Sequence, residues 1–117
     1  METPVKTWNV KFFQNARGES PVEDFIKAQD ERTYAKILTA ISLLKQGGPF
    51  LKPPFIKKLQ DKLYELRISG ASAIRIFYTM RTEEYFLLHG FKKKSQKTPP
   101  KELKIAMSVQ NRNVTPS

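Results

Sequence analysis

Lysine and arginine side chains are the residues of this sequence best suited to act on a polyanion. In the second half of the chain they recur as Lys57-Lys58, as the single residues Arg67 and Arg75, and as the run Lys92-Lys93-Lys94. Arginine keeps its charge and suits phosphate binding, whereas a lysine crowded by other cations can give up its proton. The single histidine, His89, is of the residue type most often used for proton transfer near neutral pH. These residue types predict phosphate binding combined with proton transfer.

The charged side chains are unevenly distributed along the chain. The 117 residues carry 21 Lys and Arg against 11 Asp and Glu, which gives a formal net charge of +10. Residues 1–44 hold six basic and six acidic side chains, whereas residues 45–104 hold fourteen basic and five acidic ones. A solvated surface more often mixes its signs, so the excess predicts an anion-binding face. Nucleic acid is the first candidate partner, ahead of a membrane surface.

Several kinds of site and location are excluded by composition. Cysteine is absent and His89 is the one histidine, which excludes disulfides, thiolate nucleophiles and zinc sites with two or more Cys or His ligands. We therefore expect no metal and no cofactor. Residues 1–14 lack the apolar centre of a signal peptide, and the uncharged apolar run 37–44 is shorter than a membrane span. A cytoplasmic protein without membrane attachment is expected.

The first half of the chain predicts one strand and two helices. Residues 8–13 alternate apolar and polar side chains, which is typical of a strand. Ser20-Pro21-Val22-Glu23 combines an N-cap, a proline at the first helical position and a capping box, so a short helix is predicted over 21–28. Asp30 can cap a second helix with an apolar stripe, and Gly47-Gly48-Pro49 ends it. The two helices are expected to form a hairpin whose apolar side packs against a sheet.

The second half predicts a loop followed by a meander and a last helix. Pro53 and Pro54 indicate an extended loop between Phe50 and Lys58. Three strands follow in quick succession, over residues 62–68, 73–80 and 84–91. The turns between them are short enough for hairpins, and a helix begins near Pro99.

The order of elements, β-α-α-β-β-β-α, predicts the fold class and the extent of the domain. It indicates an α+β fold in which an N-terminal strand, a two-helix hairpin and a C-terminal helix surround a small antiparallel sheet. We expect a single domain over residues 1–110 and a flexible polar tail over 111–117.

Alternation along two of the strands sorts their side chains by face. One face is expected to meet the helix hairpin and carries Tyr64, Leu66, Ile68, Ile74, Ile76 and Tyr78. The opposite face carries Glu65, Arg67 and Arg75, so the two arginines lie close together on neighbouring strands. The lysines at 57–58 and 92–94 then rim one basic cleft, with Phe77 and Phe91 as flat surfaces for unstacked RNA bases.

Each of these residues also has a plainer interpretation. Arg67 can pair with a carboxylate such as Glu65 or Glu84 across the sheet. The lysine run can be a solvated surface, and His89 at a strand end can be structural. Phe77 and Phe91 can belong to the core.

Four spaced motifs carry a resemblance to a known family. They are Leu-Tyr-Glu-Leu-Arg at 63–67, Arg-Ile-Phe-Tyr at 75–78, Leu-Leu-His-Gly-Phe-Lys-Lys at 87–93 and Lys-Thr-Pro at 97–99. With these motifs in this order, residues 8–110 resemble the RelE/ParE toxin superfamily, specifically its HigB-like and phage-derived branch. The RelE-like fold that the resemblance implies agrees with the elements expected above.

The resemblance implies a toxin of a type II toxin-antitoxin system. In the RelE and HigB branches such a toxin is a ribosome-dependent mRNA endonuclease, or mRNA interferase, which inhibits translation. The partners implied are mRNA on the ribosome and a cognate antitoxin, expected to be a helix-turn-helix protein that alone contacts operator DNA. We expect a metal-independent endoribonuclease. The alternative is a non-enzymatic ParE-type gyrase inhibitor or a nucleic-acid-binding module that uses the same basic face.

The resemblance also implies which residues act on RNA. Lysines before the second strand, an arginine in the sheet and basic groups after the last strand correspond to Lys57 or Lys58, Arg75, and Lys92 or Lys93, and geometry adds Arg67. The arginines are expected to stabilise phosphate charge, and a lysine or His89 to transfer protons. The expected catalytic set is Arg67, Arg75, Lys58, Lys93 and His89. The expected RNA-binding set is Lys57, Lys92, Lys94, Phe91 and Phe77.

Overall fold

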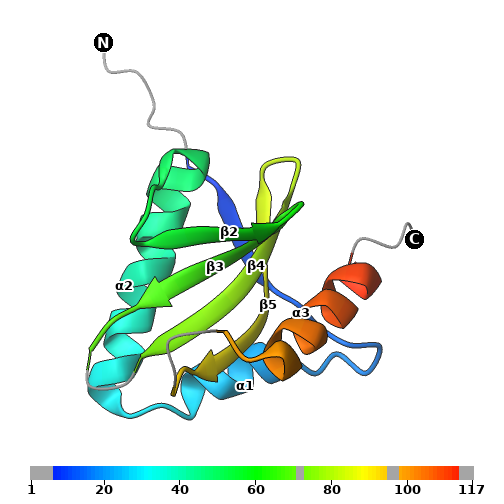
Figure 1. Ribbon diagram of the computed structural model, residues 1–117, viewed down its shortest axis with the longest axis horizontal. Helices are drawn as coiled ribbons and strands as arrows, with labels where there is room; N and C mark the ends of the chain where they lie inside the picture. The colour runs from blue at the N-terminus through cyan, green and yellow to red at the C-terminus, as the bar shows by residue number, and fades with distance from the viewer. Residues whose placement is uncertain (1–6, 71–72, 95–97, 114–117) are drawn as a thin grey trace.

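The computed structural model describes residues 7–70, 73–94 and 98–113. Its elements are β1 (Asn9–Phe12), α1 (Pro21–Lys27), α2 (Glu31–Gly47), the 3-10 helix η1 (Gly48–Phe50), β2 (Ile56–Gln60), β3 (Leu63–Ile68), β4 (Ile74–Arg81), β5 (Glu84–Lys92) and α3 (Pro100–Asn113). The strands form a five-stranded sheet in the order β1-β5-β4-β3-β2. Helices α1 and α2 cover one face of this sheet and α3 lies against the other (Figure 1). The expected α+β fold is therefore confirmed.

The sheet is mixed, whereas an antiparallel sheet was expected. Strands β2 to β5 pair antiparallel, but β1 pairs parallel with β5, with Asn9 opposite Glu84. The alternation of residues 8–13 identifies a strand but says nothing about its direction relative to a partner that lies far along the chain. The helices and the meander between β1 and β5 supply the long connection that a parallel pair needs.

Strand β2 lies where a loop was expected. It occupies Ile56–Gln60 and pairs antiparallel with β3, with Lys57 opposite Glu65. Its signal is weak because two prolines precede it and its centre is a pair of lysines, and a strand at the edge of a sheet tolerates such residues. The chain therefore enters the meander one strand earlier than the sequence indicated.

The ends of the helices follow the capping signals in the sequence. The Ser20 hydroxyl accepts a hydrogen bond from the Glu23 amide at 3.3 Å, and the Asp30 carboxylate accepts one from the Thr33 amide at 2.7 Å. At the other end of the chain α3 continues to Asn113, so residues 111–113 are helical where a tail was expected. Residues 114–117 lie outside the described residues. No helix in the described part of the chain is both long and apolar enough to cross a membrane.

The sheet is covered on both faces by separate cores. The first core joins α1 and α2 to the face that alternation assigned to them, and it buries Leu66, Ile74 and Ile76. The second core joins α3 to the opposite face. It contains Phe13, Leu63, Phe77, Leu88, Phe91, Ala106 and Val109. The face expected to carry the basic cleft is therefore partly occupied by α3, and what remains of it is the part near Glu65.

Two local features of β5 fix what it presents to each side. Phe77 pairs with His89 and Tyr78 pairs with Leu87, so Leu88 is an extra residue, a β-bulge. Leu88 joins the α3 core and His89 contacts α3, so the bulge turns two consecutive side chains toward α3. On the other side Gly90 leaves room for α1, because a Cβ at Gly90 would lie 2.6 Å from the Phe25 ring.

Candidate functional site

The candidate site is built around Glu65, a carboxylate that is completely buried in β3. One of its oxygens, Oε1, lies 3.1 Å from Nε of Arg67 and 3.6 Å from Nε of Arg75. Its other oxygen accepts a hydrogen bond from the Thr98 hydroxyl at 2.9 Å. Burying a carboxylate is strongly unfavourable unless it is paired, and here two cations and a hydroxyl surround it. We call Glu65, Arg67, Arg75, Lys93 and Thr98 the Glu65 cluster.

The two arginines meet because of the register of the sheet. Arg67 and Arg75 are direct partners across the antiparallel pair β3 and β4, and alternation places both on the α3 face. Like charges opposite one another destabilise a pair of strands, so the shared carboxylate offsets their repulsion. The Arg67 side chain is 28% exposed and that of Arg75 13%. Arg67 is therefore the more open of the two to a ligand, and Arg75 the more desolvated.

Electrostatics distinguish the members of the cluster. Burial lowers the pKa of Arg75, and the Arg67 charge adds to this while Glu65 opposes it. The guanidinium nevertheless stays charged, as arginine does in proteins. Partial burial also lowers the pKa of Lys93, followed by the charges of Arg75, Arg67 and Lys57, with Glu65 again opposing. Lys93 is thus the described lysine whose ammonium group is most directly affected by the two arginines.

The strand register separates the remaining lysines by face. Lys57 lies opposite Glu65 and shares the face of the cluster, whereas the next residue, Lys58, lies opposite Tyr64 and on the other face. Lys92 pairs with Ile74, and its charge contributes to lowering the pKa of Asp30 at the start of α2. The structure therefore brings Lys57 and Lys93 to the arginines but not Lys58 or Lys92. Lys94 is exposed beyond the end of β5.

His89 lies on the same face but belongs to the attachment of α3. Its Nε2 atom is 2.7 Å from Glu102 Oε1, and its ring stacks with Phe77 and Phe91 at centroid distances of 6.2 Å. The side chain is 19% exposed. This environment is the structural alternative that the sequence left open for His89.

The expectation that Phe77 and Phe91 stack on RNA bases is wrong. Phe77 is completely buried and Phe91 is 6% exposed, and both belong to the core beneath α3. Alternation assigned them correctly to the face opposite the helix hairpin. The error arose because the sequence gave no indication that α3 would cover that part of the face.

Two members of the cluster were missed or given a lesser role. The sequence offers Glu65 as a pairing partner for Arg67 and as part of one motif, and Thr98 as part of the Lys-Thr-Pro motif before the last helix, but neither as a site residue. The spacing of Glu65 and Arg67 at positions i and i+2 of one strand was the available signal, because it places both side chains on one face. Thr98 offers no such signal, since it reaches Glu65 through the path of the chain before α3.

The cluster offers cations and proton-transfer groups rather than a metal site. Among the described residues, no group of three or more His, Asp or Glu side chains is arranged to hold a metal ion. Two guanidinium groups and an ammonium group around one buried carboxylate leave a net positive charge. Such an arrangement can bind a phosphate group and stabilise additional negative charge on it.

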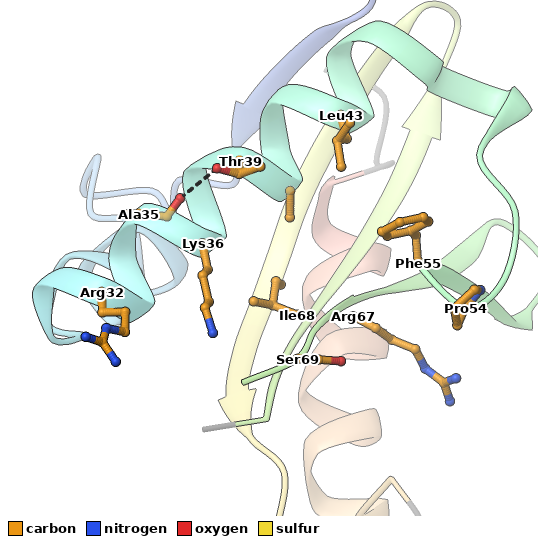
Figure 2. A pocket seen from close by; sticks show the side chains of 11 residues that line it. Arg32, Ala35, Lys36, Thr39, Leu43, Pro54, Phe55, Arg67, Ile68 and Ser69 are labelled. Atoms are coloured by element: carbon orange, nitrogen blue, oxygen red, sulfur yellow. Dashed lines mark hydrogen bonds between the residues drawn. The ribbon is translucent and has the colours of Figure 1, made fainter. Parts of the chain in front are cut away.

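A second surface feature lies between α2 and the end of β3. It is a groove of about 530 Å³ whose apolar lining includes Leu43, Phe55 and Ile68 (Figure 2). Leu43 and Phe55 are 37% and 53% exposed. Its charged lining residues are Arg32, Lys36 and Arg67, and no carboxylate lines it among the described residues. The groove and the Glu65 cluster therefore share Arg67.

Comparison with known proteins identifies a family. The model of the family described as Phage derived protein Gp49-like (DUF891) matches residues 24–110. This range contains α2, the whole meander and most of α3, and it includes every member of the Glu65 cluster. No curated protein matches the sequence significantly.

Proposed function

Because the chain belongs to the phage-derived Gp49-like family, a RelE/toxin-like family, we propose that it is the toxin of a type II toxin-antitoxin system and a ribosome-dependent mRNA endonuclease. The family match supports the assignment of the chain as a toxin. The proposal of endonuclease activity rests on one observation. Arg67, Arg75 and Lys93 converge around Glu65 on one face of the sheet. We also propose that the chain belongs to the HigB-like branch and that its antitoxin is a helix-turn-helix protein. These two points rest on the resemblance carried by the sequence motifs.

The proposed reaction is transesterification within the RNA strand. The 2′-oxygen attacks the adjacent phosphorus as its proton passes to a base, and the bond from phosphorus to the 5′-oxygen breaks as that oxygen gains a proton. The products are a 2′,3′-cyclic phosphate and a 5′-hydroxyl. Arg67 and Arg75 stabilise the charge that develops on the phosphate oxygens, where fixed donors are most effective.

Lys93 is the residue we assign to proton transfer. A general base near neutral pH needs a pKa closer to the working pH than an ordinary lysine has. Partial burial, and after it the neighbouring cations, lower the pKa of Lys93 in that direction. Its place beside both arginines would bring it to the same phosphate group.

The test is to map transcripts by primer extension after brief induction in cells. The wild type is compared at matched expression with Arg75→Ala and with Arg17→Ala, an exposed arginine in the loop between β1 and α1. The proposal expects cuts confined to translated regions, lost in Arg75→Ala and retained in Arg17→Ala. Growth arrest without cuts would contradict the endonuclease and favour the gyrase-type or binding-module alternative.

The groove beside α2 is the surface that we assign to the antitoxin. Its apolar lining and its three cations without a carboxylate complement a segment that is apolar on one side and acidic on the other. Such a segment would also reach Arg67 and so withdraw it from RNA. In the proposed pair the contact with operator DNA belongs to the antitoxin and not to this chain.

This assignment is tested by variants that place a carboxylate in the groove. Leu43→Glu and Phe55→Glu are expected to keep toxicity but to escape rescue by the coexpressed antitoxin. Phe50→Glu is the matched control, because Phe50 is 76% exposed and lies outside the groove. Full rescue of both groove variants would exclude the groove as the docking surface.

A further inference from the structure

We infer that Glu65 is a positioning residue for the proposed reaction, which holds both arginines in the orientation that a phosphate group requires. The inference rests on the proposed function and adds a residue that neither the family match nor the basic residues assign. Charge and burial are combined in an unusual way at Glu65. The one acidic side chain in the cluster is also its most buried member, at 0% exposure.

The contacts of Glu65 are made to the inner edges of the guanidinium groups. Oε1 approaches Nε of Arg67 at 3.1 Å and Nε of Arg75 at 3.6 Å. Arg75 also donates from Nη1 to the Ile74 carbonyl at 2.9 Å. Among the described residues, the Nη atoms of Arg67 have no hydrogen-bond partner. The carboxylate therefore holds Arg67 by a hydrogen bond to Nε, and it holds Arg75 by charge alone, because the buried Nε of Arg75 has no hydrogen-bond partner among the described residues. Arg75 is oriented in addition by its bond to Ile74, and both groups keep Nη donors for a ligand.

Glu65 is itself held from the opposite side. The Thr98 hydroxyl donates to Oε2 at 2.9 Å, so the carboxylate is fixed by the residue that leads into α3. Both arginines are then held by one buried carboxylate, Arg67 by a hydrogen bond and Arg75 by an ion pair, rather than by solvent. A site that is preorganised in this way does not have to reorient its donors when charge develops on the phosphate.

The charge of Glu65 works against RNA binding while its geometry works for catalysis. Removing the negative charge makes the cluster more positive, which strengthens attraction to a polyanion. The same change leaves Arg67 and Arg75 facing one another without a shared negative charge, so they repel and lose their fixed orientation. Binding and catalysis are therefore expected to respond to Glu65→Gln in opposite directions. A merely structural role would weaken both, and a merely electrostatic role would strengthen both.

The experiment measures single-turnover cleavage of an mRNA on programmed ribosomes, and separately the affinity of the protein for a single-stranded RNA. We expect Glu65→Gln to lower the maximal cleavage rate roughly 10²-fold while RNA affinity is unchanged or higher. Glu65→Asp keeps the charge and is expected to recover part of the rate. Glu84→Gln is the matched control, since it removes the same charge from a partly exposed residue paired with Lys11 at the far end of β5. Equal losses in rate and affinity, or an unchanged rate, would overturn the inference.

A second measurement does not depend on cleavage. In ¹⁵N-edited NMR spectra, recorded with and without inorganic phosphate as the probe, the Nε–H signal of Arg67 is expected to exchange slowly in the wild type and to be lost in Glu65→Gln. Thr98→Val, which removes only the hydroxyl contact, is expected to show an intermediate effect if Glu65→Gln does not fold. If the wild type cleaves no mRNA yet shows the protected signal, the proposed function fails and the positioning geometry stands. If cleavage occurs and the Nε–H signal of Arg67 is not protected, the positioning role fails alone.

Discussion

The imidazole of His89 lies 2.7 Å from the Glu102 carboxylate and thereby ties β5 to the first turn of α3. Both side chains are about four-fifths buried, with exposed fractions of 19% and 20%. A hydrogen bond between partly buried groups, one of them charged, contributes more to stability than a solvated ion pair does. This relationship makes the role of His89 testable apart from RNA cleavage.

We expect His89→Gln and Glu102→Gln to lower the unfolding free energy by similar amounts, about 1–3 kcal/mol each. Because the two side chains act on one contact, the double variant should be less destabilised than the sum of the single ones. Chemical denaturation of the four proteins measures this cycle. If His89→Gln abolished cleavage while Glu102→Gln left it intact, His89 would have a role in proton transfer instead.

The two neighbouring lysines of β2 provide a matched pair for RNA binding. Lys57 faces the Glu65 cluster and Lys58 faces the other side, although both are exposed. Lys57→Ala is expected to weaken RNA affinity several-fold more than Lys58→Ala, because charges act more strongly on a phosphate bound nearby. Fluorescence anisotropy with one labelled RNA compares them. A larger loss in Lys58→Ala would place the RNA on the face of α1 and α2.

Salt dependence tests whether the cluster binds phosphates at all. Each phosphate contact releases counterions, so RNA affinity should fall steeply as salt rises. Arg67→Ala is expected to reduce the slope of log affinity against log salt by about 1. A flat response in the wild type would show that binding does not depend on these cations.

The lowered pKa of Lys93 predicts how the stability of the protein depends on pH. Partial burial and then the charges of Arg75, Arg67 and Lys57 hold its pKa below the usual 10.5. Between the lowered pKa and 10.5 the unfolded chain binds more protons at this residue than the folded chain, so stability rises with pH through that window. Lys93→Met is expected to remove this rise. Denaturation curves at neutral and alkaline pH check it, and a rise of the same size in Lys93→Met would assign the effect to another group.

The same residue is expected to set the pH dependence of the proposed cleavage. If Lys93 is the base, the rate should increase with pH as its neutral amine becomes populated, and Lys93→Arg should abolish the increase because arginine stays protonated. RNA affinity should move in the opposite direction, since the cluster loses a positive charge. Rates and affinities measured over one pH series separate the two effects.

Much of the fold was predictable because its signals are local. The caps at Ser20 and Asp30 mark helix starts by side chains that bond three residues away. Alternation separated Leu66 from Glu65 and Arg67 correctly, since the period of a strand is fixed by its backbone. The same period places Arg67 and Glu65 on one face, which is why their pairing was one of the alternatives that the sequence left open.

The remaining features depend on contacts between distant segments. The burial of Phe77 and Phe91 depends on how α3 folds back over the sheet, and the parallel pairing of β1 depends on where the whole meander ends. The complete burial of Glu65 could not be predicted either, because a carboxylate in a sequence most often lies at the surface. Only the assembled neighbours of such a residue show that it can be buried.

The connectivity of the sheet has a consequence for the order of folding. The Glu65 cluster comes from β3, β4 and the segment between β5 and α3, and the strands of the meander pair with their neighbours along the chain. Strand β1 must instead close its pair with β5 across nearly the whole domain. Because closing a long loop is slower than closing a short one, the meander is expected to form first and β1 to join last. The Glu65 cluster is therefore expected to assemble before β1 completes the sheet.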